Sequence, residues 1–208
     1  MSKKVIERLK QAFGDAVLQT HSQHGDDTAL VDATRWKEIA LFLRDDAKCA
    51  MDHFIDLTAV DYLDRRELRY EVVLHLRSTD KLHRVRLKAG VGVAPSGTPS
   101  EDADRPIIDT LSDVWAGANW FERECFDMFG IEFIGHPDMR RILMYPEFVG
   151  YPLRKDYPAQ QTQPLVDYRP EALGKLPPFD DQEGMPFGRQ THAQEAGRRE
   201  NALGFPED

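Results

Sequence analysis

Residues 70–89, YEVVLHLRSTDKLHRVRLKA, decide the fold class, because they hold two alternating segments joined by a polar turn. Every second side chain of the first segment is apolar, at Tyr70, Val72, Leu74 and Leu76. In the returning segment, basic side chains alternate with His83, Val85, Leu87 and Ala89. A period of two residues is typical of β-strands, and residues 78–81 have the composition of a turn. The stretch therefore predicts an antiparallel hairpin.

The sequence on both sides of the hairpin predicts helices and further strands. Apolar side chains three to four residues apart predict one helix over residues 3–13 and another from about Thr34 to Arg44, capped by Asp32 or Thr34. Short segments of strand-like composition lie at residues 16–20, 28–32, 51–60 and 107–111. Antiparallel strands in sequence after helices indicate an α+β fold.

Two segments are rich in residues that interrupt regular structure. Residues 90–106 contain three Gly and three Pro, and we expect an exposed loop there. Residues 158–208 carry seven of the chain's 13 prolines and few apolar side chains. We therefore divide the chain into a domain, residues 1–157, and an extended Pro-rich tail, residues 158–208. Such a tail cannot bury enough surface to fold alone, so we expect it to be mobile or to lie on partner subunits.

Composition argues against several classes of function. The chain has 208 residues and a net charge of −9, and polyanions repel an acidic protein, so we expect no nucleic-acid partner. No apolar run approaches the roughly 20 residues of a membrane helix, so membrane attachment is expected only through partners. Cys49 and Cys125 lie far apart, without further Cys or His at ligand spacing. We expect no zinc ribbon and no iron–sulfur cluster held by this chain alone.

Nucleotide-binding motifs are incomplete. Gly92 and Gly97 have the spacing of a phosphate-binding loop, but Thr98 stands where the lysine is needed. A dinucleotide fingerprint beginning at Gly90 fails at Pro95. His21 and His24 have metal-pair spacing, although exposed loop histidines explain them more simply. We predict no nucleotide or metal site.

Residues 112–158 form the densest block. Asn119 and Glu122 have the spacing of a capping box, and Gly130 that of a left-handed stop, which predicts a helix over Trp120–Phe129. Its apolar stripe comprises Phe121, Cys125, Met128 and Phe129, with Arg123, Glu124 and Asp127 opposite. Large aromatic residues outside that stripe, Trp120 and Phe126, suggest that the helix is covered on more than one side.

Two interpretations of this block's polar residues remain open. Glu122, Glu124 and Asp127 could act as acid/base groups with His136, but acidic residues near a helix start are also explained by capping and packing. A basic concentration downstream fits either a solvated face or an interface, at Arg140, Arg141, Arg154 and Lys155.

The run ERECFDMFGIEFIGHPDMRRIL, residues 122–143, resembles the signature of the C subunit of respiratory complex I, which is the 30 kDa subunit family. The run GYPLRKDYP, residues 150–158, resembles that family's second marker, although Tyr151 stands where many members carry His. The resemblance implies a two-layer α+β domain with helices packed on one face of a mixed β-sheet. It also implies that the block's residues define the fold or an interface, at Glu122, Arg123, Glu124, Asp127, Gly130, His136, Arg140, Arg141, Arg154, Lys155 and Asp156.

The resemblance further implies a cofactor-free structural subunit of the peripheral arm of a proton-translocating NADH–quinone oxidoreductase. FMN and iron–sulfur clusters would be bound by other subunits, and NADH and quinone met only through the complex. The expected neighbours are other peripheral-arm subunits, especially the D subunit, on the cytoplasmic side of the bacterial inner membrane. Two alternatives are the equivalent subunit of a membrane-bound hydrogenase or other-donor dehydrogenase, and a free-standing hydrolase using Glu124, Asp127 and His136.

Overall fold

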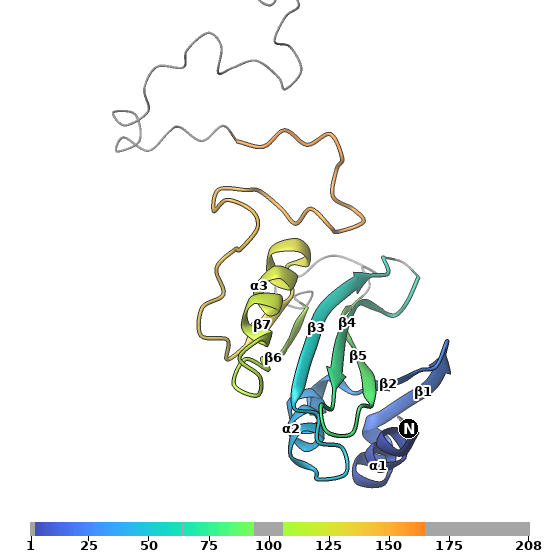
Figure 1. Ribbon diagram of the computed structural model, residues 1–208. Coiled ribbons are helices and arrows are strands. Elements are labelled where there is room, and N and C mark those ends of the chain that lie inside the picture. The colour runs from blue at the N-terminus through green and yellow to red at the C-terminus, as the bar shows by residue number, and fades with distance from the viewer. Residues whose placement is uncertain (1–2, 64, 94–105, 165–208) are drawn as a thin grey trace, which may run out of the picture. The chain divides into compact units, whose positions relative to one another are not determined.

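A five-stranded mixed sheet forms the centre of the computed structural model, which describes residues 3–63, 65–93 and 106–164 (Figure 1). Its strands lie in the order β1-β2-β5-β4-β3. Strands β2 and β5 are parallel, and the other neighbouring pairs are antiparallel. The strand bounds are β1 Val17–Gln23, β2 Asp26–Val31, β3 His53–Asp61, β4 Leu68–Arg77 and β5 Arg84–Val93.

The predicted hairpin is confirmed as β4 and β5, the two central antiparallel strands. Its register places Tyr70 opposite Val91 and Leu76 opposite Val85, so the alternating apolar residues share one buried face. The loop expected at residues 90–106 is wrong for its first four residues, because β5 continues through Val93. Strand β4 offers backbone hydrogen bonds along that length, which outweighs the local effect of two glycines. Residues 94–105 lie outside the described part.

Two predicted helices pack together on the face of the sheet that forms the hydrophobic core. Helix α1 spans Lys3–Phe13 and helix α2 spans Trp36–Asp45. Short 3₁₀ turns, η1 (Gly14–Ala16) and η2 (Ala33–Arg35), precede β1 and α2. The Asp32 carboxylate accepts a hydrogen bond from the Thr34 N–H at 2.9 Å, but it caps η2 and not the helix. The cap predicted for α2 is therefore wrong, because this helix begins at Trp36 with Arg35 at its cap position and no side-chain cap. Edge-to-face contact between Phe13 and Phe42 joins the two helices.

Helix α3, Ala118–Phe129, lies beside the edge strand β3. The thiol of Cys125 contacts the carbonyl oxygen of Leu57 at 3.7 Å, and the rings of Phe121 and Phe54 are 5.4 Å apart. Two short parallel strands flank this helix in sequence, β6 (Ile107–Asp109) and β7 (Glu132–Ile134). They form a separate two-stranded sheet that positions the turns on either side of α3.

The core lies between the helices and one face of the five-stranded sheet. It includes Val5 and Leu9 of α1, Ile39 and Leu43 of α2, and the inward side chains of β2, β4 and β5. The opposite face is largely polar. This arrangement confirms the two-layer α+β fold with helices on one face of a mixed sheet. Residues 1–164 form one unit and residues 165–208 another, and most of the expected tail belongs to the undescribed second unit. Among the described helices, none has the length and hydrophobicity to cross a membrane.

Candidate functional site

The signature block folds into one region, where the segment after β7 runs alongside α3 (Figure 1). Residues 135–164 of this segment contain no helix or strand. Their backbone N–H and C=O groups therefore need partners other than a regular ladder. Three clusters of buried charged side chains supply many of those partners.

The first cluster is formed around the side chain of Glu122 in the interior of the domain. Its side chain is fully buried, and Oε1 accepts a hydrogen bond from the Leu111 N–H at 2.6 Å. Oε2 is hydrogen-bonded to the hydroxyl of Thr110, which also lies 2.8 Å from the hydroxyl of Ser112. Glu122 therefore ties α3 to the segment that follows β6.

The same carboxyl group lies close to a buried histidine. Burial raises the pKa of Glu122 to about 7, against the lowering effect of its hydrogen bonds. Nε2 of His136, whose side chain is also fully buried, is 4.0 Å from the carboxylate. The N–H of Asp138 donates to Nδ1 of His136 at 3.0 Å, which assigns the ring proton to Nε2, facing the carbonyl of Asn119 at 3.1 Å. His136 thus joins the turn after β7 to the start of α3.

The predicted capping box is wrong. Helix α3 begins at Ala118 with Gly117 at the cap position, so Asn119 lies within the first turn and no side chain caps the helix. Glu122 points into the core instead of back toward the helix start. Two hydrogen-bond donors in the core, the Thr110 hydroxyl and the Leu111 N–H, bind its carboxyl group there. The predicted stop is confirmed, since Gly130 has a left-handed φ of 76°.

The second cluster is centred on Asp127, whose side chain is fully buried. Oδ2 accepts hydrogen bonds from the backbone N–H groups of Ile142, Leu143 and Met144 at 3.2, 2.7 and 2.7 Å. Oδ1 accepts one from Nη1 of Arg141 at 2.7 Å. Although burial acts to raise it, these donors hold the pKa of Asp127 below its usual value. Asp127 is therefore the anchor of the loop that follows.

Arg123 strengthens this anchorage from one turn earlier in α3. Its Nε and Nη2 donate to the carbonyl oxygens of Arg140 and Arg141 at 2.9 and 3.2 Å. The helix face predicted to carry Arg123, Glu124 and Asp127 is therefore not a single exposed face. Asp127 is buried and Arg123 is half-buried, whereas Glu124 is exposed.

The Tyr151 ring contacts two arginines and helps to hold the second marker segment, residues 150–158. The guanidinium carbons of Arg141 and Arg154 are 5.3 and 4.3 Å from its ring centre. Nε of Arg154 also donates to the Phe129 carbonyl at 2.6 Å. A Cβ at Gly130 would lie 2.4 Å from Nη2 of Arg154 and 2.7 Å from the Tyr151 ring. Glycine is needed there both for its positive φ and for this close approach.

The third cluster fastens the marker to the end of the sheet. Asp61, the last residue of β3, is fully buried and accepts two hydrogen bonds from Arg69 at 3.1 and 3.0 Å. It also accepts from the backbone N–H groups of Leu63 and Lys155 at 2.9 and 2.8 Å. Arg69 in turn pairs with Asp156 at 2.7 Å. The segment from Arg154 to Asp156 is thereby held against both β3 and β4.

Sequence reasoning missed Asp61, Arg69 and Thr110, although each has a central place in these clusters. Asp61 and Arg69 bracket the turn between β3 and β4, and opposite charges at the two ends of a hairpin turn are a recognisable signal. Thr110 carries no comparable signal, because its partner is 12 residues away along an irregular path.

The predicted basic and acidic residues divide into internal and external groups. Arg141 and Arg154 are engaged within the loops, as described above. Arg140 pairs with Asp138 at the surface, where their side chains are 80% and 41% exposed. Lys155 contributes its backbone N–H, and it is exposed, as Glu124 is.

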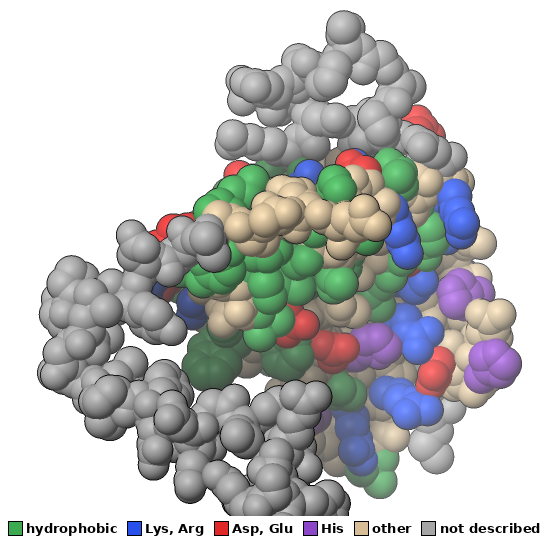
Figure 2. All heavy atoms as spheres, turned by 90° about the horizontal axis from the view of Figure 1, so that it is seen from above, with side chains coloured by type: hydrophobic (Ala, Val, Ile, Leu, Met, Phe, Trp, Pro, Cys, Tyr) green, Lys and Arg blue, Asp and Glu red, His purple; other side chains and the backbone are tan. Residues whose placement is uncertain are grey.

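The ordered loops present apolar side chains outward. Trp120 on α3 is 69% exposed. Five further apolar residues of the region are also exposed: Ile134, Leu143, Tyr145, Val149 and Leu153. We call these six residues the signature surface. In Figure 2, which looks down on this end of the molecule, hydrophobic side chains are exposed close to basic ones. Exposed Trp and Tyr beside Arg are typical of protein–protein interfaces.

The arrangement does not provide a catalytic constellation. Glu122 and Asp127 have no exposed side-chain surface, and their oxygens are occupied by protein donors. Glu124 is exposed and lies on another face of α3, so it shares no cleft with His136. Within the described residues, no group of three or more His, Cys, Asp or Glu could hold a metal ion. This geometry does not support the hydrolase alternative.

Comparison with known proteins identifies relatives over most of the chain. The family described as respiratory-chain NADH dehydrogenase, 30 Kd subunit, matches residues 29–163. The NADH-quinone oxidoreductase C subunit of Roseiflexus sp. (strain RS-1) is 40% identical over 175 residues, which cover 84% of this chain and 94% of the relative. The protein of the same name from Geobacter sulfurreducens is 41% identical over 157 residues, covering 76% of this chain and 90% of the relative.

Solved structures share the fold. The trypsin-resistant fragment (1-134) of Nqo5 is 27% identical, with a TM-score of 0.51, over 66% of this chain and 99% of the fragment. A chain of the membrane-bound sulfane sulfur reductase, an archaeal respiratory membrane complex, is 19% identical, with a TM-score of 0.61. That match covers 89% of this chain and 98% of the other, and at this identity it shows similarity of fold alone.

Proposed function

The chain belongs to the family of the 30 kDa subunit of respiratory-chain NADH dehydrogenase, and on that premise we propose that it is a cofactor-free structural subunit of a proton-translocating NADH–quinone oxidoreductase. In this role it forms part of the peripheral arm. Electrons pass from NADH through FMN and iron–sulfur clusters to quinone in other subunits, and this chain holds its neighbours in position.

One observation supports the structural role most strongly. Asp127, Arg141 and Arg154 of the signature block are directed into the protein, where they hold an irregular loop. Trp120 and its apolar neighbours point outward. Ordering a loop before docking reduces the entropy lost on binding. A rigid loop with exposed aromatic anchors is therefore suited to binding a protein surface.

The names of the relatives favour NADH–quinone oxidoreductase over the alternative complexes. The curated relatives above are named as the C subunit of NADH-quinone oxidoreductase, whereas the sulfane sulfur reductase chain shares only the fold. Within the proposed complex, the D subunit is the neighbour that we assign to the signature surface. The chain is then peripheral, on the cytoplasmic side of the inner membrane, and reaches the membrane only through partners.

The experiment replaces Trp120 with alanine in an affinity-tagged chain and purifies the complex from membranes in mild detergent. Truncation of a central interface tryptophan typically costs about 2 kcal/mol or more, which is roughly a thirty-fold loss of affinity. We expect Trp120→Ala to lose the D subunit from the purified complex without a change in the unfolding midpoint of the isolated chain. Leu18→Ala is the matched control, because Leu18 is 61% exposed on the distant strand β1.

The isolated chain provides an independent check. We expect no absorption above the aromatic band and no oxidation of NADH in the presence of quinone. A flavin or iron–sulfur spectrum from the pure chain would contradict the cofactor-free role. Full retention of the D subunit by Trp120→Ala would contradict the assigned docking surface.

A further inference from the structure

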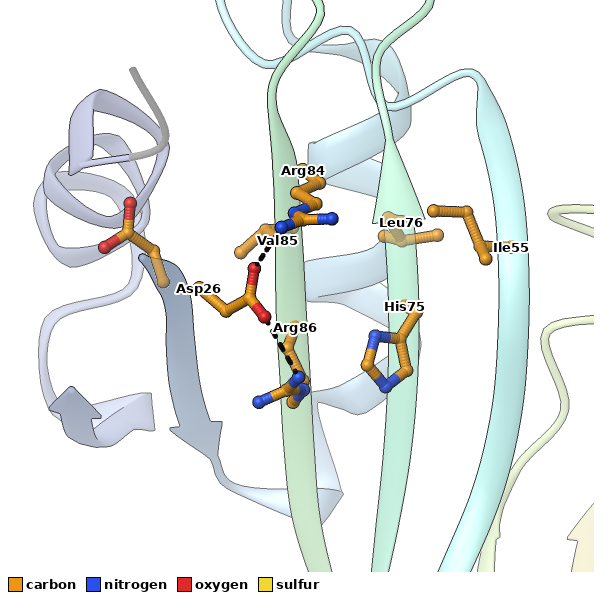
Figure 3. Close-up of a pocket in the computed structure, with 8 residues that line it drawn as sticks. Asp26, Ile55, His75, Leu76, Arg84, Val85 and Arg86 are labelled. Atoms are coloured by element: carbon orange, nitrogen blue, oxygen red, sulfur yellow. Dashed lines mark ion pairs between the residues drawn. The ribbon is translucent and has the colours of Figure 1, made fainter. Parts of the chain in front are cut away.

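The face of the five-stranded sheet that points away from α2 carries a hollow of about 250 Å³. Figure 3 views this face with α2 behind it and shows side chains from β2, β3, β4 and β5 around the hollow. The lining includes Asp26, Ile55, His75, Arg84 and Arg86. In the described part of the chain, no helix covers this face.

Strand register brings like charges together beside the hollow. Arg77 of β4 lies directly opposite Arg84 of β5. His75 lies opposite Arg86, but burial and Arg86 lower the pKa of this histidine, so the like-charged pair is Arg77 with Arg84. On the far side of β4, His53 is opposite Arg77. Directly opposed like charges destabilise an antiparallel pair. Arg77, Arg84 and Arg86 thus form a cationic row on this face, and the repulsion between Arg77 and Arg84 does not help the sheet to fold.

Carboxylates of the described residues neutralise this row only in part. Asp26 is the acceptor for two guanidinium groups, with its oxygens 2.8 Å from Nη2 of Arg84 and 3.6 Å from Nη2 of Arg86 (Figure 3). Asp56 lies opposite His75, and Asp27 also lines the hollow. Among the described residues, none forms a salt bridge with Arg77, which is exposed. Among the described residues of this face, the Arg77 guanidinium therefore remains available to an external carboxylate, although the chain as a whole has a net charge of −9.

We propose that this face, centred on Arg77, Arg84 and Arg86, docks an acidic segment of a second partner subunit. The inference rests on the proposed role as a structural subunit, but it uses none of the residues of the signature surface. Guanidinium groups bind carboxylates through paired hydrogen bonds, and Ile55, which is 42% exposed, offers apolar contact beside them.

A short acidic protein segment fits this face better than a polyanion. Asp26 lies within the cationic row, and the net charge of the chain repels a long phosphate backbone or an anionic membrane. A segment with one or two carboxylates meets the guanidinium groups without that long-range cost. The chain then has two docking faces, one apolar and one cationic, as a subunit that bridges two neighbours requires.

Arg77→Glu tests the proposal, because it has opposite effects on folding and on docking. The new carboxylate faces Arg84, so the isolated chain is expected to unfold at the same or a higher denaturant concentration. In complexes purified with the tagged full-length chain, at least one subunit other than the D subunit is expected to fall at least tenfold. Lys4→Glu, an equal change of charge on exposed α1, is the control and is expected to retain all subunits.

A photo-crosslinking residue at position 55 then identifies the occupant. An acidic segment of a partner subunit supports the proposal. Retention of every subunit by Arg77→Glu, or a crosslink to a segment without Asp or Glu, overturns it. Binding of the isolated chain to phosphatidylserine vesicles or duplex DNA that is abolished by Arg77→Glu also overturns it. Trp120→Ala reports on the proposed function separately, since its failure to release the D subunit leaves the Arg77 result unaffected.

Discussion

Replacing Asp127 with asparagine tests whether a buried charge organises the signature loop. The side chain keeps its size, and its remaining oxygen can still accept from the three backbone N–H groups that Oδ2 now accepts from. Its new NH₂ group, however, faces Nη1 of Arg141, which is also a donor. The substitution therefore removes the negative charge and places two donors against each other.

The structure sets the size of the expected effect. Changing one partner of a buried ion pair typically costs about 3–5 kcal/mol. Arg141 is 16% exposed and keeps its hydrogen bond to the Gly150 carbonyl, so water and that carbonyl reduce the loss. We expect a decrease in unfolding free energy of about 3 kcal/mol. For a chain of this size, that corresponds to a fall in midpoint temperature of about 6–12 °C.

Urea unfolding of the isolated chain at pH 7, followed by circular dichroism, measures this effect. Hydrogen exchange gives a local readout, because the amides of Leu143 and Met144 should lose protection before those of the sheet. Asp138→Asn is the control, since its ion pair with Arg140 is exposed and screened by water, so its loss should have little effect on stability. The anchoring role of Asp127 would be refuted if Asp127→Asn were as stable as Asp138→Asn and if the amides of Leu143 and Met144 were as protected in Asp127→Asn as in the parent chain.

Three further predictions concern single buried sites. Gly130→Ala should destabilise the chain by about 1–2 kcal/mol more than Gly25→Ala, as measured by urea unfolding. Both glycines have a positive φ, but of the two only Gly130 has side chains within reach of an added Cβ. The pKa of Glu122 is raised in the folded chain, so its contribution to stability is complete below about pH 4.5 and declines until about pH 7. Glu122→Gln should therefore gain stability relative to the parent chain as the pH rises, by up to about 3 kcal/mol at pH 8. Equal pH dependence of unfolding in both proteins would oppose this. Burial raises the pKa of Cys49 to about 12 and also raises that of Cys125, so neither thiol should react with a thiol reagent at pH 8 until urea unfolds the chain, as absorbance of the released chromophore will report.

Local periodicity was sufficient to predict the hairpin and the first two helices, because each signal lies within about twenty residues. Alternating side chains at Tyr70, Val72 and Leu74 need only one buried face to define a strand. The parallel pairing of β2 with β5 has no such local signal, since it joins residues 28–31 to residues 86–89 across the rest of the domain. Its mixed character was expected only from the resemblance to a known family.

The site was harder to predict for a physical reason that Glu122 makes clear. An acidic residue three positions after Asn119 satisfies the capping-box spacing, yet the same spacing allows the side chain to point into the core. The choice depends on the donors of Thr110 and Leu111, which approach only in the folded chain. Sequence spacing therefore located the important residues but not the direction of their side chains.

Buried charged side chains in this protein supply the hydrogen-bond partners that secondary structure would otherwise provide to the irregular segment after β7. The backbone of residues 142–144 has neither a helix nor a strand to receive its N–H groups, and one carboxylate, that of Asp127, receives all three. Arg154 likewise donates to the carbonyl of Phe129 at the end of α3. Because these bonds are internal, the loop is ordered before it meets a partner, and its exposed apolar residues can bind without a large ordering cost. This explains how a block of Asp, Glu, Arg and His can resemble a catalytic constellation in sequence while it supports a docking surface in the folded protein.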